Sequence, residues 1–356
     1  MRNNSIMKDN QGISFFERNL PIWVLGCMAL GIAIGQYFPG FAVRLEKLQV
    51  LNTSIPIAVL TWIMIFPMML KIDLKAILNV RKNYKGVVIS SFTSWAVKPF
   101  LMFGLAIFFF FVVFKNFIPT ELAQNYVAGA VLLGAAPCTA MVFVWSTLTK
   151  GDPAHTLVQV SINDLLIIIL FVPIVSFLLN ATNIFVPWDI LFGSVIAFVA
   201  VPLVGGALTR YLIIKHKGVK FFSQSFLPFF EPVTIVGLLA TLVIIFTFQG
   251  NIIVSNPFHV LLIAIPLVLQ NIITALFAYG SCRLAKQPHN VAAPAALIGA
   301  SDFFELSVAV AITLFGVNSP VVLVCTVGVL TEVPVMLLLV KFINKTQSWF
   351  SYKNIS

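Results

Sequence analysis

The stretch LLGAAPCTA at residues 132–140 places a glycine, a proline and a cysteine inside an otherwise apolar segment. A second stretch, LIGASDFFE at residues 297–305, also begins with a Leu-x-Gly-Ala run and then continues into polar residues. Proline cannot donate a hydrogen bond to the carbonyl four residues back, and glycine weakens a helix interior, so both stretches predict a break in a helix. A simple bend in a continuous helix is the alternative.

The composition indicates a membrane protein with many spans. Of the 356 residues 60% are hydrophobic and 10% are charged, with a mean hydropathy of +1.01, whereas soluble domains are about 25% charged. The apolar runs are long and continuous, which predicts an all-α protein, because helices satisfy their own backbone groups in lipid. The candidate spans are residues 21–37, 53–70, 86–113, 126–149, 157–179, 189–213, 230–248, 258–281, 291–315 and 320–342.

The short connections exclude several function classes. They leave no room for a soluble catalytic or ATP-hydrolysing domain, and no Gly-rich phosphate loop is present. We therefore expect no enzyme and a transport driven by a gradient, unless a separate subunit supplies the energy. The four cysteines lie in or at the ends of apolar runs, without a disulfide framework or a C-x-x-C pattern. We therefore expect no cofactor and no resident metal.

The basic residues predict the orientation. The net charge is +10, but its distribution argues against a nucleic-acid partner. With the N-terminus inside, 18 of the 22 basic residues fall in cytoplasmic segments and only Arg44, Lys47 and Lys115 fall outside, as the positive-inside rule requires. We expect a multi-pass protein of the cell (inner or plasma) membrane, surrounded by lipid, with both termini in the cytoplasm and no cleaved signal peptide.

The span order predicts an inverted repeat. Five spans precede the loop at residues 180–188 and five follow it, and an odd number per half turns the second half upside down. The two broken stretches then occupy the fourth span of each half. The expected units are a tail at 1–20, a first repeat at 21–179, a second repeat at 189–342 and a tail at 343–356.

Intramembrane carboxylates are the first candidate site residues. Asp302 and Glu305 are three residues apart, which would place them on one helical face. Charged groups at this depth need water, a partner or a proton, so the pair is a candidate proton carrier. The alternative is a salt bridge to Lys98, which lies about 20 Å into its span at 1.5 Å per residue.

Further polar residues lie deep in other spans. Glu332 precedes a proline in the last span, and Asn163 and Asp164 lie in the inner half of the fifth span. We assign them to proton coupling, with hydrogen bonding between helices as the alternative.

Cys138 differs from the other cysteines because it lies at a predicted break. Backbone N–H groups at a break favour the thiolate, and thiolates select soft solutes. We assign Cys138, Thr139, Ser301 and Glu305 to substrate binding, with an inert buried cysteine as the alternative.

Four longer stretches resemble a known family: APCTAMVFVWSTLTKGD (136–152), QVSINDLLII (159–168), GASDFFELSVAVAITLFG (299–316) and LTEVPVMLLLV (330–340). They are similar to the arsenical-resistance arsenite efflux permeases of the bile acid/arsenite/riboflavin transporter superfamily, and the resemblance covers residues 20–343. It implies two inverted five-helix repeats whose discontinuous fourth and ninth helices cross. It also implies export of trivalent arsenite, in some members antimonite, in exchange for protons.

The resemblance also assigns residues. The essential cysteine falls on Cys138, the span-nine carboxylate on Glu305, the span-ten acid on Glu332 and the Asn-Asp pair on Asn163 and Asp164. Two positions depart from the family: Pro137 stands where some members carry an arginine, and Asp302 stands where an amide is common. The extra acid leaves the number of exchanged protons, and the ion itself, open.

Two other function classes are alternatives to arsenite export. Sodium-coupled uptake of an organic anion is the activity of the bile-acid branch, and polar groups near crossed helices can also bind Na⁺. A receptor or scaffold without transport is disfavoured, because buried charges would then have no use. Selectivity between arsenite and antimonite and the oligomeric state are left open, with a homodimer as one candidate.

Overall fold

The computed structural model describes residues 19–50, 53–71, 84–139, 141–182, 184 and 186–350. Within these residues the chain is helical throughout, apart from loops and a pair of two-residue antiparallel strands, β1 (Gln49–Val50) and β2 (Thr53–Ser54). The prediction of an all-helical protein is therefore confirmed for the described residues.

The first half of the chain contains long helices interrupted by π-helical turns, which are labelled η. Its helices are α2 (Leu20–Tyr37), α3 (Pro39–Glu46), α4 (Ile55–Lys71), α6 (Tyr84–Phe92), η2 (Thr93–Val97), α7 (Lys98–Ile107), η3 (Phe108–Val113), α8 (Thr120–Gly134), α9 (Val142–Leu148) and α10 (Pro153–Asn180).

The second half has the same character, and its last element is a 3₁₀ turn. Its helices are α11 (Trp188–Val195), η4 (Ile196–Ala200), α12 (Val201–Phe221), η5 (Phe222–Phe226), α13 (Leu227–Ser255), α14 (Pro257–Leu284), α15 (His289–Ala300), α16 (Phe304–Phe315), α17 (Pro320–Lys345) and η6 (Gln347–Phe350).

Several helices are suited to crossing a membrane. By length and composition, 5 helical stretches of the described chain qualify, or 6 if the bent pair Ile22–Tyr37 and Pro39–Leu45 is one span. One of these stretches, Trp188–Ser255, reverses direction at Gly218, whose φ of +80° a residue with a side chain rarely adopts. Each of the predicted spans overlaps helical structure, and the spans 126–149 and 291–315 are each interrupted by a break. The number of spans and the inverted repeat stay predictions.

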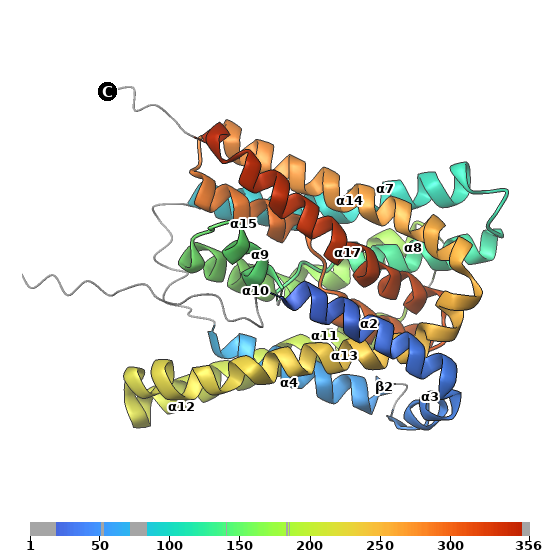
Figure 1. Cartoon of the computed structure of the whole chain (residues 1–356), viewed down its shortest axis with the longest axis horizontal. Coiled ribbons are helices and arrows are strands. Elements are labelled where there is room, and N and C mark those ends of the chain that lie inside the picture. The colour runs from blue at the N-terminus through green and yellow to red at the C-terminus, as the bar shows by residue number, and fades with distance from the viewer. Residues whose placement is uncertain are drawn as a thin grey trace, which may run out of the picture.

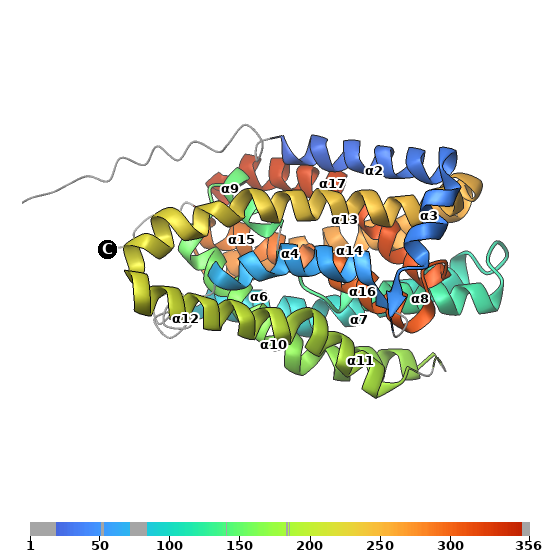
Figure 2. The ribbon, with the colours of Figure 1, turned by 90° about the horizontal axis from the view of Figure 1, so that it is seen from below.

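The helices form two groups (Figures 1 and 2). In one group α13 packs along α2 and α4, and α4 also packs against α12. In the other group α17 packs against α8, α14 and α16, and α14 packs against α15. Both predicted breaks lie in this second group.

The two expected tails, 1–20 and 343–356, are only partly covered by the described residues. Residues 1–18 lie outside the described residues. At the other end α17 continues to Lys345, and Phe350 of η6 packs against Tyr279 of α14 with ring centroids 4.7 Å apart. The segment expected as a tail from residue 343 is therefore ordered as far as residue 350.

Candidate functional site

The two broken spans meet at their breaks. Helix α8 ends at Gly134, α9 begins at Val142, and between them Pro137 pairs antiparallel with Asp302, which lies in the gap between α15 and α16. The Cys138 N–H donates to the Ser301 carbonyl at 3.3 Å, and the Phe303 N–H donates to the Ala136 carbonyl at 2.9 Å. Each break thus satisfies backbone groups that the other leaves unpaired. The predicted breaks are confirmed, and a simple bend is excluded.

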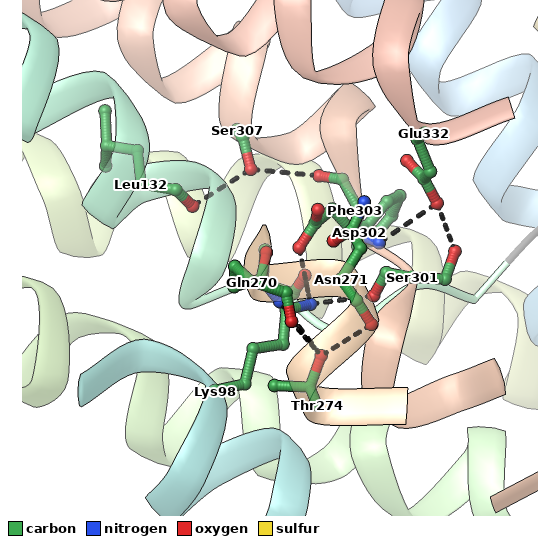
Figure 3. A network of polar contacts seen from close by, with 11 residues as sticks. Lys98, Leu132, Gln270, Asn271, Thr274, Ser301, Asp302, Phe303, Ser307 and Glu332 are labelled. Carbon is green, nitrogen blue, oxygen red and sulfur yellow. Dashed lines mark hydrogen bonds and ion pairs between the residues drawn. The ribbon is translucent and has the colours of Figure 1, made fainter. Parts of the chain in front are cut away.

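The position of Asp302 differs from the prediction that it shares a helical face with Glu305. It lies in extended backbone before α16 begins at Phe304, so the three-residue spacing does not place it on a helical face with Glu305. Its Oδ1 atom instead lies 2.6 Å from the Lys98 Nζ atom, and both side chains are almost fully buried (Figure 3). The alternative, a salt bridge between Asp302 and Lys98, is the arrangement found.

Lys98 also contacts the backbone of both breaks. Its ammonium donates to the Ser301 carbonyl at 2.7 Å and to the Ala136 carbonyl at 3.2 Å. Lys98 is the first residue of α7, directly after the π-helical turn η2, and π-helical turns are frequent at functional sites. From the sequence, Lys98 is expected only as an alternative partner for Asp302. Its depth in an apolar run was the signal that it belongs to the site.

Glu332 extends the network from α17. Its Oε1 atom accepts a hydrogen bond from the Ser301 hydroxyl and a second one, at 3.1 Å, from the Asp302 N–H (Figure 3). The carboxyl is buried. Glu332 therefore holds the second break through one side-chain and one backbone donor, as a deep carboxylate requires.

Cys138 lies inside this cluster. Its thiol is buried beside the Ser301 side chain and the backbone of Met141, within electrostatic range of the Glu332 and Glu305 carboxyls. The structure thus brings together residues predicted from separate spans. Thr139 is buried at the same break.

Glu305 is a buried carboxyl without a fixed partner among the described residues. It lies in the first turn of α16, and within the described chain neither of its oxygens has a hydrogen-bond partner. A buried charge without a partner is strongly disfavoured. The position therefore suits a group that takes up and releases a proton.

Asn163 and Asp164 lie on α10, outside the Ser301–Glu332 network. The Asn163 Oδ1 atom accepts a hydrogen bond from the indole N–H of Trp95 at 3.1 Å. Both Asp164 oxygens are buried and have no hydrogen-bond partner among the described residues. Since Trp95 belongs to η2, α10 contacts the turn that precedes Lys98.

Several polar residues around the breaks were not predicted from the sequence. The Ser307 hydroxyl of α16 donates to the Leu132 carbonyl of α8 at 3.0 Å. On α14, which packs against α7 and α15, Figure 3 draws Gln270 and Asn271 together with the Lys98–Ser301 network. Their side-chain carbonyl oxygens are buried with no hydrogen-bond partner among the described residues. Two adjacent amides deep in an apolar span were the available signal.

Comparison with known proteins identifies the family to which this chain belongs. The profile described as the Sodium Bile acid symporter family matches residues 58–256. The arsenical-resistance protein Acr3 of Alkaliphilus metalliredigens is 55% identical over 350 residues, covering 98% of each chain. The chain is an Acr3-type member of the sodium bile acid symporter family.

Two other relatives are similar to nearly the whole chain. The arsenical-resistance protein Acr3 of Corynebacterium glutamicum is 32% identical over 338 residues, which cover 92% of this chain and 88% of the relative. An uncharacterized transporter of Synechocystis sp. is 42% identical over 357 residues, covering 98% and 93%. Membership in this family makes the Acr3-type chain a multi-pass membrane transporter. No group of three or more His, Cys, Asp or Glu side chains suited to a metal ion occurs in the part of the chain that the structure describes.

Proposed function

We propose that the protein exports trivalent arsenite from the cytoplasm in exchange for protons and thereby confers arsenic resistance. The observation that supports this most directly is the buried Cys138 thiol beside Ser301, Glu332 and Glu305 at the paired breaks. The names of the two Acr3 relatives support the resistance function. Antimonite, which is chemically similar, is the second candidate substrate.

The cysteine supplies the soft contact for arsenic. Thiolate sulfur prefers soft centres. A single thiol can bind arsenite and release it again, whereas three converging thiols would trap it. When As(OH)₃ reacts with the Cys138 thiol, an As–S bond forms, an As–O bond breaks, and the thiol proton leaves with the hydroxide as water. The remaining As–OH groups can donate to Glu332 and accept from Ser301. The reaction at sulfur consumes and releases no net proton.

The exchanged proton must therefore be carried by a carboxyl. Glu305 is our first candidate, because no fixed donor or cation in the described chain satisfies its oxygens. Asp164 is the second for the same reason, with Asn163 beside it in the relay. Reciprocity requires that protonation of the carrier weaken arsenite binding, because arsenite binding must weaken proton binding.

The ten-span inverted repeat supplies the movement in this proposal. The two groups of helices would rock against each other and expose the paired breaks first to the cytoplasm and then to the outside. In this scheme the protein lies in the cell membrane, and both of its termini are in the cytoplasm. The support is the pairing of Pro137 with Asp302, which brings the fourth and ninth predicted spans together.

Transport in everted membrane vesicles tests the proposal. Radiolabelled arsenite should accumulate under a proton gradient, and Cys138→Ser and Glu305→Gln should each reduce accumulation at least tenfold. Cys282→Ser is the matched control, because Cys282 is equally buried but lies near the end of α14. Full accumulation in both site variants would contradict the proposal.

Sodium-coupled uptake of an organic anion is the second candidate function. The family description is compatible with it. The buried carbonyl oxygens of Gln270 and Asn271, which have no hydrogen-bond partner in the described chain, favour it. Varying the sodium and pH gradients separately in the same vesicles distinguishes the two functions. Transport that survives collapse of the proton gradient but needs Na⁺ would favour the second.

A further inference from the structure

Three oxygen atoms converge on the Lys98 ammonium at the paired breaks. They are the Asp302 carboxylate oxygen at 2.6 Å, the Ser301 carbonyl at 2.7 Å and the Ala136 carbonyl at 3.2 Å. Lys98 is fully buried. The ammonium thus joins the first break, the second break and α7 at one point.

These oxygens form the kind of set that binds a small metal cation. Carboxylate and backbone carbonyl oxygens are the ligands that hard cations take in proteins. The side-chain carbonyl oxygens of Gln270 and Asn271, buried and without a hydrogen-bond partner in the described chain, lie on the adjacent α14 (Figure 3). The neighbourhood therefore offers more oxygen ligands than the three that Lys98 uses.

We propose that Lys98 is a built-in cation, which occupies the place where a coupling Na⁺ ion would otherwise bind and makes transport independent of sodium. The coupling part of this inference rests on the proposed proton exchange. A sodium ion cannot share these oxygens with the ammonium, because two positive charges about 3 Å apart repel strongly in a buried site. Since Lys98 is attached to α7, this cation cannot cross the membrane.

An ion pair with a purely structural role makes a different prediction. If Lys98 only stabilises Asp302, removing the lysine side chain leaves an unpaired carboxylate. The resulting loss of protein stability would then be the same in every monovalent salt. If Lys98 replaces a cation, shortening the side chain opens a site that Na⁺ can fill. The Lys98→Ala variant separates these two cases.

Thermal unfolding of the purified protein provides the first measurement. Melting temperatures are compared in NaCl and in N-methylglucamine chloride at equal ionic strength. The wild type should show no difference, and Lys98→Ala should show a saturable rise in Na⁺ of about 2 °C or more, because a ligand that binds only the folded state stabilises it. An equal melting temperature of Lys98→Ala in both salts would overturn the proposal.

Two control variants sharpen the result. Lys98→Met removes the charge but fills most of the space, so no sodium-dependent shift is expected. Lys98→Ala combined with Asp302→Asn removes the carboxylate ligand, so the shift should disappear. A shift of the same size in either control would show that Na⁺ acts elsewhere and would overturn the proposal.

The wild type provides a test that does not depend on the folding of a variant. Arsenite flux in proteoliposomes should change less than twofold when Na⁺ is replaced by N-methylglucamine, and a requirement for Na⁺ would overturn the proposal. The unfolding measurements need no arsenite. If they succeed while arsenite flux is absent, the cation assignment stands and the proposed function fails.

Discussion

Pro137 and Asp302, 165 residues apart in the chain, pair antiparallel at the point where two broken spans meet. The pairing uses backbone groups that neither helix can satisfy alone, and Lys98 adds an ammonium that binds carbonyls of both breaks. A change in the position of one break is therefore transmitted directly to the other. The substrate contacts proposed for Cys138 and Ser301 would be coupled through this pairing.

Ser301→Ala should weaken arsenite binding. The variant removes the hydroxyl that donates to Glu332 and lies beside the Cys138 thiol. A hydrogen bond to a charged group contributes roughly 1.5–3 kcal/mol, so we expect the KM for arsenite to rise by about tenfold or more. Ser176→Ala is the control, since this buried hydroxyl on α10 has no partner among the described residues. An unchanged KM for Ser301→Ala would argue against Ser301 as a substrate contact.

Glu305→Gln should remove the pH dependence of arsenite binding. Because protonation of the carrier weakens binding, the wild type should bind arsenite more tightly as the pH rises. The glutamine is neutral at every pH, like the protonated acid, so the variant should bind weakly throughout. Binding of radiolabelled arsenite to purified protein between pH 5 and pH 9 measures this. Glu121→Gln, at the exposed start of α8, should keep the wild-type profile.

Arsenite should protect Cys138 from alkylation. In a variant with Cys27, Cys282 and Cys325 changed to serine, Cys138 is the remaining cysteine of the sequence. A small maleimide should label it slowly, and arsenite should slow labelling at least threefold, because the As–S bond occupies the sulfur. Labelling is followed by mass spectrometry. Equal rates with and without arsenite would count against the As–S contact.

Gly129→Ala should destabilise the protein. A Cβ atom there would lie 2.6 Å from the Val321 carbonyl oxygen and 2.6 Å from the Val324 Cβ atom, so α8 and α17 would have to separate. Overpacking of this kind costs about 1–3 kcal/mol. Gly104→Ala meets no atom within 4 Å and should be neutral or slightly stabilising. Thermal unfolding in detergent compares the two, and equal melting temperatures would contradict the prediction.

Asp164→Asn should separate transport from stability. Because neither oxygen of Asp164 has a hydrogen-bond partner in the described chain, a neutral amide should leave the melting temperature unchanged or higher. Proton-coupled efflux should fall at least fivefold if Asp164 belongs to the relay. A lower melting temperature with normal efflux would indicate a structural role.

The predicted breaks at residues 132–140 and 297–305 agree with the structure because their cause is local. A proline lacks its donor in any surroundings, and small residues support a membrane helix weakly. The depth of Glu332 and Cys138 also followed from the length of their apolar runs, since a helix advances 1.5 Å per residue.

The position of Asp302 could not be predicted in the same way. The three-residue spacing to Glu305 implied a shared face only if the helix continued through residue 302, and the structure shows extended backbone there. The Lys98 pairing stayed an open alternative because span three and span nine are separated by about 200 residues. Gln270 and Asn271 were missed because nothing in their own span shows which neighbour they face.

The sequence by itself determined an all-helical membrane protein, where its helices break, and which residues could carry a proton or bind a soft solute. These properties follow from hydropathy and from the backbone chemistry of single residues, which act over a few positions. The tertiary structure decided which of those residues meet. It pairs Lys98 with Asp302, joins Glu332 to Ser301 and leaves Glu305 without a partner in the described chain. The partners of these buried side chains are set by the packing of helices that are distant in the chain. A buried charge therefore finds its hydrogen-bond or ion-pair partner only when those helices have packed together.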